Sequence, residues 1–488
     1  MNALAGGTRD PDQAAARRAG IWVLAYLALP NLIFMAGWLR PEFGWPAALA
    51  VALACGLLGR GAWRPAWPAG APGAVGRLAQ AGAWALVWLL LSGTGHLVYA
   101  NSDWLVRDAV LADLIGAPWP VVYHSVANFG DLLLRAPLGI YLPAALVGKL
   151  LGPDAGLVAF FLWCLLGLAL VTALLARGAT SQREVASRLL VFVLFSGMDI
   201  VGSVLSKQLP VMGGHIEWWA GLFQYSSHTT QLFWVPNHAL PGWLVVAWLL
   251  GMKRGALPTG LALALIACVP LWSPLTAIGL APLLLVAGID ALRAQGARAL
   301  LQPAGLVVAL VLAGLVFPYL LLAGQALPFT MATGHAPPTY FWERYVEFVL
   351  LEFLPLGVLL LLRDRRDPLV WTAVLVLLLL PLVRFGPYND LAMRASIPAL
   401  AVLAIRMGTW FAERWSQPGG AEDTRASFAM LLFAIGALTP LLEFSRVLVL
   451  SPWAFNPQRS VIATTGGNAP HYLAPVDQEW VRRMLRQP

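Results

Sequence analysis

Acidic and basic side chains lie one helical turn apart where a polar stretch begins near residue 100. The residues at 101–108 read NSDWLVRD, so Asp103 and Arg107 are four residues apart, and Asp108 follows directly. A carboxylate held rigidly at such a position has the chemistry of a general base or of a metal ligand. The competing interpretation is structural, because the same spacing gives an ordinary ion pair on a helix expected over 102–115.

A second polar stretch, 207–237, is followed directly by His238 and holds many hydroxyl, amide and aromatic side chains. Histidine beside glutamate suggests zinc, but no tight ligand spacing such as H-E-x-x-H is present. The composition favours a wall for a polyhydroxylated ligand, since aromatic faces stack on sugars and amides or imidazoles hydrogen-bond hydroxyl groups. A structured loop with satisfied polar groups is the alternative. The candidate residues in this region are Lys207, His215, Glu217, His228 and His238.

Two arginines and an aspartate mark a third polar stretch, at 384–396. Arg394 lies at the mouth of an apolar segment, where a cation is costly unless it is paired or serves a ligand. The planar guanidinium matches phosphate oxygens, so Arg394 and Arg384 are candidates for binding an anion. Asp390 precedes Arg394 by four residues and can pair with it instead, while Asn389 is a further polar neighbour.

The composition excludes a water-soluble globule. Of the 488 residues 59% are hydrophobic and only 11% are charged, and the mean hydropathy is +0.72. Soluble domains carry about 25% charged residues. This chain carries far fewer, which excludes a soluble enzyme and a nucleic-acid binder. Its three cysteines lie in apolar runs at wide spacings, which predicts neither a disulfide nor a metal site.

The elements that must position these residues are apolar segments of membrane-spanning character. Because lipid leaves backbone groups no outside partner, we expect an all-α polytopic membrane protein. The segments lie at 21–38, 46–58, 79–99, 137–151, 156–176, 189–206, 238–252, 260–272, 275–290, 304–323, 346–363, 370–384, 396–412 and 427–449. They form one expected domain, 1–449, followed by a short extracytoplasmic tail, 450–488.

Basic residues in the short loops set the expected orientation. All of these loops can lie in the cytoplasm if 137–151, which contains Pro143 and Lys149, is an interfacial or half-membrane helix. About thirteen crossings result, with the N-terminus cytoplasmic and the C-terminus extracytoplasmic. The polar stretches at 100–155, 207–237, 324–345, 385–395 and after 450 then all face outward, so we expect the protein to work on that face.

Some chemistries find no motif in the chain. A Walker phosphate loop, a dinucleotide fingerprint and a nucleophile elbow are all absent. Acidic residues inside the spans are few, namely Asp199, Glu352 and Glu443, and no relay among them is expected from their spacing. An ion-coupled transporter usually needs such intramembrane charges, so this pattern counts against one.

The stretch 101–178 resembles the opening of the GT-C superfamily of membrane glycosyltransferases, such as the lipid-linked aminoarabinose transferases and the protein O-mannosyltransferases. Asp103 falls on the acidic position of that family's first outer loop. Arg135-Ala136-Pro137 stands where the family has a basic-Pro-Pro element, and Tyr141 matches its aromatic residue. The resemblance implies a GT-C-like fold in a membrane, here expected to be the bacterial inner membrane.

The resemblance also implies a reaction. A polyprenyl-phosphate sugar enters from the outer leaflet, Asp103 activates an acceptor hydroxyl as general base, and the sugar is transferred with inversion to a glycan, lipid or protein. Whether a divalent metal takes part is left open. The expected ligands of the donor phosphate are Arg394, Arg384, Lys207 and Arg135. The expected sugar or acceptor pocket comprises Arg107, Asp108, Tyr141, His215, Glu217, His228, His238, Asn389 and Asp390.

Three alternatives remain at this point. An O-antigen-type polysaccharide polymerase or ligase also uses lipid-linked sugars, but typically through a large outer loop late in the chain. A flippase or transporter of lipid-linked sugars needs a pathway open alternately to both sides. A non-catalytic assembly scaffold is compatible with the sequence as well.

Overall fold

The computed structural model is mostly helical, as the apolar segments predict. It describes residues 11–60, 62, 72–299, 302–322, 329–332, 338–386, 389–416 and 424–486. Each of the predicted apolar segments holds a helix or a pair of helices. Of the polar stretch predicted at 324–345, residues 324–328 and 333–337 lie outside the described residues.

Eight helices of the described part are long and apolar enough to cross a membrane, or nine if a bent pair counts as one span. This agrees with a helical membrane protein, while the count of thirteen crossings stays a prediction. The long continuous helices are α1 (Pro11–Trp38), α2 (Pro41–Leu58), α6 (Pro153–Ala176), α12 (Pro274–Gln295), α13 (Pro303–Leu321) and α18 (Ile397–Ser416).

Several other apolar segments form broken helices. The pairs are α7 (Gln182–Leu194) with α8 (Asp199–Leu205), α14 (Pro338–Glu352) with α15 (Leu354–Arg363), and α19 (Thr424–Gly436) with α20 (Leu438–Val449). A further short helix, α17 (Asp390–Ala395), leads into α18. The sequence predicted each of the paired segments as one uninterrupted helix, and the interruptions are findings of the structure.

Shorter apolar helices complete the bundle: α3 (Ala74–Leu90), α5 (Leu142–Leu151), α10 (Pro236–Leu250), α11 (Thr259–Cys268) and α16 (Pro368–Leu379), followed by the 3-10 turn η3 (Leu380–Leu382); η1 (Gly296–Ala299) extends α12. With ten residues, α5 is only about 15 Å long, half of a hydrocarbon core of about 30 Å. Its Lys149 ammonium donates to the backbone oxygen of Ala117. These features fit the predicted half-membrane helix.

Local sequence signals explain where many helices begin. Proline occupies the first turn of α2, α6, α10, α12, α13 and α16, where its missing N–H costs nothing. Ser273 accepts a hydrogen bond from Thr276 N at the start of α12, and Asp367 accepts from Leu369 N at the start of α16. These side chains satisfy backbone donors that a helix leaves unpaired.

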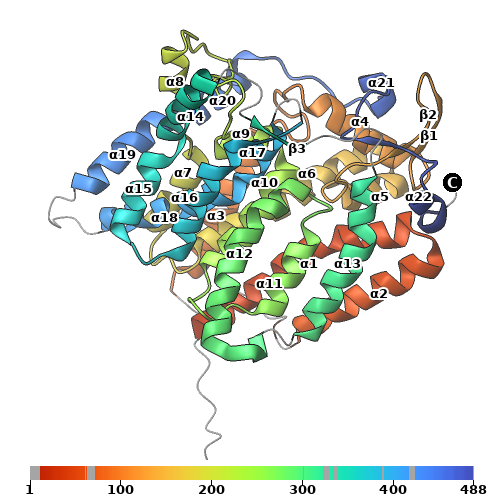
Figure 1. Ribbon diagram of the computed structural model, residues 1–488, viewed down its shortest axis with the longest axis horizontal. Helices are drawn as coiled ribbons and strands as arrows, with labels where there is room; N and C mark the ends of the chain where they lie inside the picture. The colour runs from red at the N-terminus through yellow and green to blue at the C-terminus, as the bar shows by residue number, and fades with distance from the viewer. Residues whose placement is uncertain are drawn as a thin grey trace, which may run out of the picture.

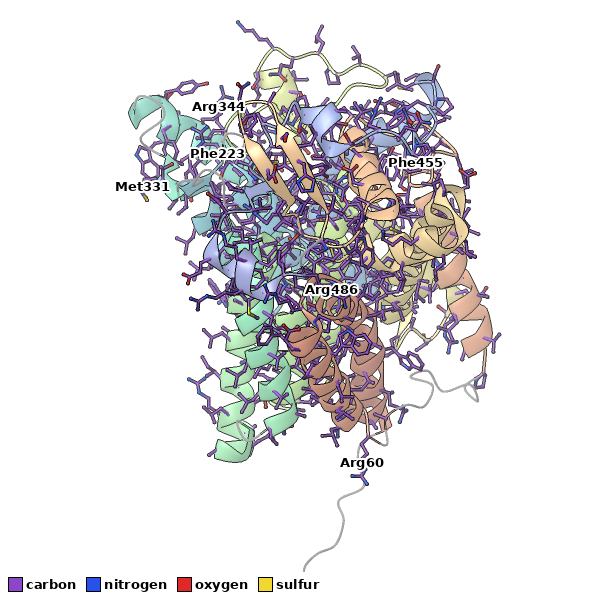
Figure 2. The ribbon with its side chains drawn as sticks, turned by 90° about the vertical axis from the view of Figure 1, so that its right-hand side faces the viewer. Arg60, Phe223, Met331, Arg344, Phe455 and Arg486 are labelled. Atoms are coloured by element: carbon purple, nitrogen blue, oxygen red, sulfur yellow. The ribbon has the colours of Figure 1, made fainter. Side chains whose placement is uncertain are left out.

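The basic loops predicted to share one side of the membrane do lie together. The Arg177 guanidinium donates to Gly251 O at 2.7 Å, and Arg254 donates to Arg366 O at 3.4 Å. Figure 2 shows Arg60 at the end of the molecule opposite Arg344 and Phe455. We call the end that holds Arg344 and Phe455 the loop end. Which end faces the cytoplasm stays a prediction.

The loop end contains structure that the sequence analysis did not predict. Two small antiparallel sheets form there, one of β1 (Val122–Val126), β2 (Gly130–Leu134) and β5 (Leu473–Pro475), the other of β3 (Phe329–Met331) and β4 (Val383–Phe385). The helix expected over 102–115 is present there as α4 (Trp104–Gly116), and the short helices α9 (His228–Trp234), α21 (Val461–Thr465) and α22 (Glu479–Met484) lie with it. In Figure 1, α4, α21, β1 and β2 gather above the long helices α1, α2 and α13.

Residues 450–486 are therefore not a separate tail. Strand β5 pairs with β2, and Val461 N donates to the Asp113 carboxylate at 2.8 Å. Arg486 donates to backbone oxygens of Leu39 and Ala36 at the end of α1. The segment thus crosses the whole loop end and forms part of the wall described next.

Candidate functional site

A cavity of about 1700 Å³ lies below the loop end. Its lining comes from α4, the segment 135–141, the loop before α9, the helices α10 to α13, the segment 385–394 and the tail. Of the residues predicted from the sequence, the cavity brings together Asp103, Arg107, Arg135, Tyr141, His215, His238, Asp390 and Arg394. Side chains from chain positions nearly 300 residues apart therefore face one space.

The N-terminal end of α4 supplies a carboxylate and a guanidinium to this cavity. The Asp103 side chain is 39% exposed, whereas that of Arg107 is 6% exposed, and the two lie 3.8 Å apart. Arg107 donates to the Asn237 side-chain oxygen at 2.7 Å, and its Nε has no protein partner. Trp104, which donates to Phe233 O at 2.9 Å, fixes the turn against α9. The Asp103–Arg107 contact is too long for a hydrogen bond, so both remain able to bind a ligand.

The tail holds a second arginine in place. Arg135 N donates to Tyr472 O at 2.6 Å, and the Arg135 guanidinium donates to Pro470 O at 3.2 Å. Its Nε is buried without a protein partner. Burial lowers the pKa of Arg135, but the group remains a cation at neutral pH. A buried guanidinium with an unused donor is suited to an anionic ligand.

The third arginine approaches from α17. Arg394 lies 3.8 Å from Asp390, and Asp390 lies 3.9 Å from His471 of the tail. Burial lowers the pKa of His471, while the charge of Asp390 opposes this shift. Asn389 precedes the helix with φ of 55° and donates to Leu222 O, which fixes the turn. Arg394 is thus loosely paired and faces the same cavity as Asp103.

The other half of the cavity is apolar. Small residues of α12 and α13, including Ala281 and Ala313, leave a groove between these helices, and α11 packs against both. Figure 1 shows α12 and α13 on either side of α11. Lining residues Phe317 and Leu321 are 46% and 75% exposed. Since these helices have membrane-spanning character, the groove reaches a surface that faces lipid.

The remaining predicted site residues are not among those that line the cavity. Asp108 is buried against His96 at 2.9 Å, and burial raises its pKa although the hydrogen bond with His96 opposes this. Buried His228 pairs with Phe192 O, 2.8 Å away. Glu217 accepts from Ser227 N behind the cavity wall.

Three more predicted residues also lie outside the lining. Lys207 is exposed on the loop after α8. Arg384 lies in β4 and donates to Gly386 O, and Asn389 serves the turn before α17. The polarity of these residues and the predicted side of their loops could not distinguish them from Asp390 and Arg394, which do line the cavity.

Sequence reasoning missed the contribution of the tail and that of Asn237 in α10. His471, Tyr472 and Asn237 all line the cavity. No local signal marks the first two, because they reach the site only through the pairing of β5 with β2. Asn237 is the last residue of the polar stretch 207–237 and could have been included on that ground.

The sequence indicated no relay among the acids inside the spans, and the structure brings two of them together. Asp199 and Glu352 lie within hydrogen-bonding reach of each other, and Glu443 lies 2.6 Å from His215 of the cavity wall. Within the described ranges no group of three or more His, Cys, Asp or Glu side chains could hold a metal ion.

No protein-family model matches the chain, and no curated protein matches it significantly.

Proposed function

We propose that this protein is a GT-C-like membrane glycosyltransferase, which moves a sugar from a polyprenyl-phosphate donor to an acceptor on the extracytoplasmic face. The proposal includes about thirteen crossings and a bacterial inner membrane. One observation carries it: a single cavity joins an arginine-rich polar end, which also holds a carboxylate, to an apolar groove that opens toward lipid. A ligand that is both anionic and long-chained matches both ends.

The charge of the polar end favours an anion. Arg107, Arg135 and Arg394 outnumber the acids Asp103 and Asp390, and two of the guanidinium groups have an Nε without a protein partner. Buried cations are stable when a counter-ion joins them. A phosphate among these three side chains would supply that charge, and the guanidinium fork matches its oxygens.

The apolar groove orients the ligand and adds little to the affinity with which it binds. A lipid tail that moves from the bilayer into the groove exchanges one apolar environment for another, so its free energy changes little. The groove instead aligns the phosphate with the three arginines. The lining residues Tyr141, His215 and His238 then face the sugar or the acceptor.

Asp103 is the proposed general base. Its carboxylate takes the proton of the acceptor hydroxyl as that oxygen bonds to the anomeric carbon from the side opposite the phosphate. The bond from that carbon to the phosphate oxygen breaks, its electron pair stays on the phosphate, and the configuration inverts. The arginines stabilise the negative charge that develops on the leaving phosphate.

The test compares Asp103→Asn with the wild type and with Asp154→Asn, which changes an exposed acid at the start of α6. Purified proteins in lipid nanodiscs receive radiolabelled polyprenyl-phosphate sugars and candidate acceptors. Loss of the base should lower kcat by about 10²- to 10⁴-fold with little change in KM, and the control should match the wild type. Unchanged kcat in Asp103→Asn would overturn the assignment. Donor movement across the bilayer without transfer would favour the flippase alternative.

A further inference from the structure

Three helical paths that each contain an interruption meet beside the cavity, and one of them is sharply bent. The path of α7 and α8 is interrupted at 195–198, that of α14 and α15 bends by 51° at Phe353, and that of α19 and α20 is interrupted at Ala437. Met198 N donates to Leu351 O at 2.9 Å across the first two breaks. Broken helices at membrane depth persist where other groups satisfy the freed backbone and where a polar site is built.

Two carboxyl groups face each other at this junction. Asp199 and Glu352 are 1% and 2% exposed, and we call them the acid pair. One Asp199 oxygen accepts from Ser196 Oγ at 2.9 Å and from Thr439 Oγ1 at 3.0 Å. One Glu352 oxygen accepts from Trp219 Nε1 at 3.0 Å.

The remaining oxygens of the acid pair have no donor. Asp199 Oδ1 and Glu352 Oε2 are buried without a partner that carries a hydrogen, yet the two side chains lie within hydrogen-bonding reach of each other. Two ionised carboxylates only accept hydrogen bonds, so this contact needs a proton between them. Both oxygens ionised at this distance in a buried site would repel strongly.

The charges around the acid pair strengthen this conclusion. The other titratable groups that interact within this cluster are Glu217, Glu443, His215 and Tyr225, and the guanidinium of Arg446 is 3.9 Å from Glu443. In the described part of the chain no lysine or arginine forms an ion pair with either member of the acid pair. Four buried carboxyl groups thus share at most two cations, and neutrality requires bound protons.

The cluster also touches the cavity. His215 lines the cavity, and its ring nitrogens lie 2.6 Å from Glu443 and 4.0 Å from Glu217. Burial raises the pKa of Glu217 to about 7, so this carboxyl can take up and release a proton near neutral pH. For His215, burial lowers the pKa, but the hydrogen bond with Glu443 and the nearby acids outweigh it and raise the pKa.

We propose that Asp199 and Glu352 form a proton-binding site that exchanges with the cavity through Glu217 and His215. The ligand of this site is one proton held between two carboxyl oxygens, and it lies where the three interrupted helical paths meet. The glycosyl transfer proposed above does not use this proton, so the two proposals stand or fall separately.

Infrared spectroscopy tests the site directly, because a protonated carboxyl and a carboxylate absorb at separate frequencies. The wild type in nanodiscs should show a band of a buried protonated carboxyl at a pH well above the pKa of Glu217, where Glu217 itself is ionised. The variants Glu352→Gln and Asp199→Asn should each lose it. The control Glu347→Gln, on the same helix but half exposed and paired with Arg344, should keep it.

Two results would overturn the proposal. One is a wild-type spectrum without the band, which needs no variant to fold. The other is a band that vanishes when sodium replaces potassium at constant pH, since the acid pair would then hold a metal cation. Thermal unfolding of each variant, followed by tryptophan fluorescence, verifies that a lost band does not reflect a lost fold.

The exchange route has its own measurement. In D₂O the band shifts as deuterium replaces the proton, and the rate of the shift reports access from water. His215→Gln should slow this shift, because it removes the group that connects the cluster to the cavity. An unchanged rate would overturn the route through His215.

Discussion

Two arginines ten residues apart should differ sharply in their effect on lipid-phosphate binding. Arg394 lines the cavity, while Arg384 lies in β4 and donates to Gly386 O outside it. The sequence made both candidates for the donor phosphate. The variants Arg394→Gln and Arg384→Gln therefore separate a role set by cavity geometry from one set by charge alone.

The expected magnitude follows from the contacts of Arg394. Its guanidinium is 3.8 Å from Asp390, beyond hydrogen-bond distance, so its donors can serve a ligand. A hydrogen bond to a charged group contributes about 1.5–3 kcal/mol. Since 1.4 kcal/mol is tenfold in affinity, Arg394→Gln should raise Kd by about 10- to 150-fold. Substitutions outside the site usually stay within about 0.5 kcal/mol, so Arg384→Gln and Lys207→Gln should change Kd by about twofold or less.

A binding assay avoids the question of which sugar is carried. Radiolabelled polyprenyl phosphate without a sugar is titrated against the protein in nanodiscs of neutral lipid, and the bound label is counted. Equal losses of affinity in Arg394→Gln, Arg384→Gln and Lys207→Gln would show a diffuse charge effect and refute the argument from the cavity. Unchanged binding in Arg394→Gln would refute it as well.

Three further predictions concern stability. Gly279→Ala should destabilise the protein by about 1–3 kcal/mol, because the added methyl would lie 2.0 Å from a backbone oxygen of α17, whereas Gly288→Ala on the same helix meets nothing and should be neutral; thermal unfolding compares them. Glu217→Gln should flatten the pH dependence of unfolding, because burial raises the pKa of Glu217 from 4.5 to about 7. The free energy of unfolding of the wild type then falls by on the order of 3 kcal/mol as pH rises through that window. An equal slope in the variant would contradict this. Asp113→Ala removes the acceptor for the first backbone amide of α21 and for a tyrosine hydroxyl of β1, so it should cost about 1–3 kcal/mol and speed proteolysis after residue 450; an unchanged cleavage rate would show that this contact does not hold the tail.

Hydrophobic runs predicted the bundle because lipid forces each backbone segment to satisfy its own hydrogen bonds. The same runs could not reveal where helices break. The interruption at 195–198 is held by distant groups, such as His228 N donating to Phe195 O. A local pattern of apolar residues carries no record of such partners.

The candidate site was predicted in part for a similar reason. The predicted topology placed Asp103 and Arg394 on the same face of the membrane, and both residues line one cavity. It could not rank Arg394 above Arg384, since both have the same polarity and lie on the same loop. It also could not foresee His471, which depends on pairing between β2 and β5 across more than 300 residues.

The position of β5 and Arg486 in the fold has a consequence for biosynthesis. The ribosome makes residues 470–486 after all the apolar helices of the described chain have been synthesised, yet residues of this segment line the cavity and bind the end of α1. The nascent chain can therefore insert its apolar helices while the arginine-lined cavity still lacks the part of its wall that the tail supplies. Completion of the cavity is then a late step of maturation. A protein truncated after residue 450 by a premature stop codon would lack this part of the cavity wall even when its apolar helices are fully inserted.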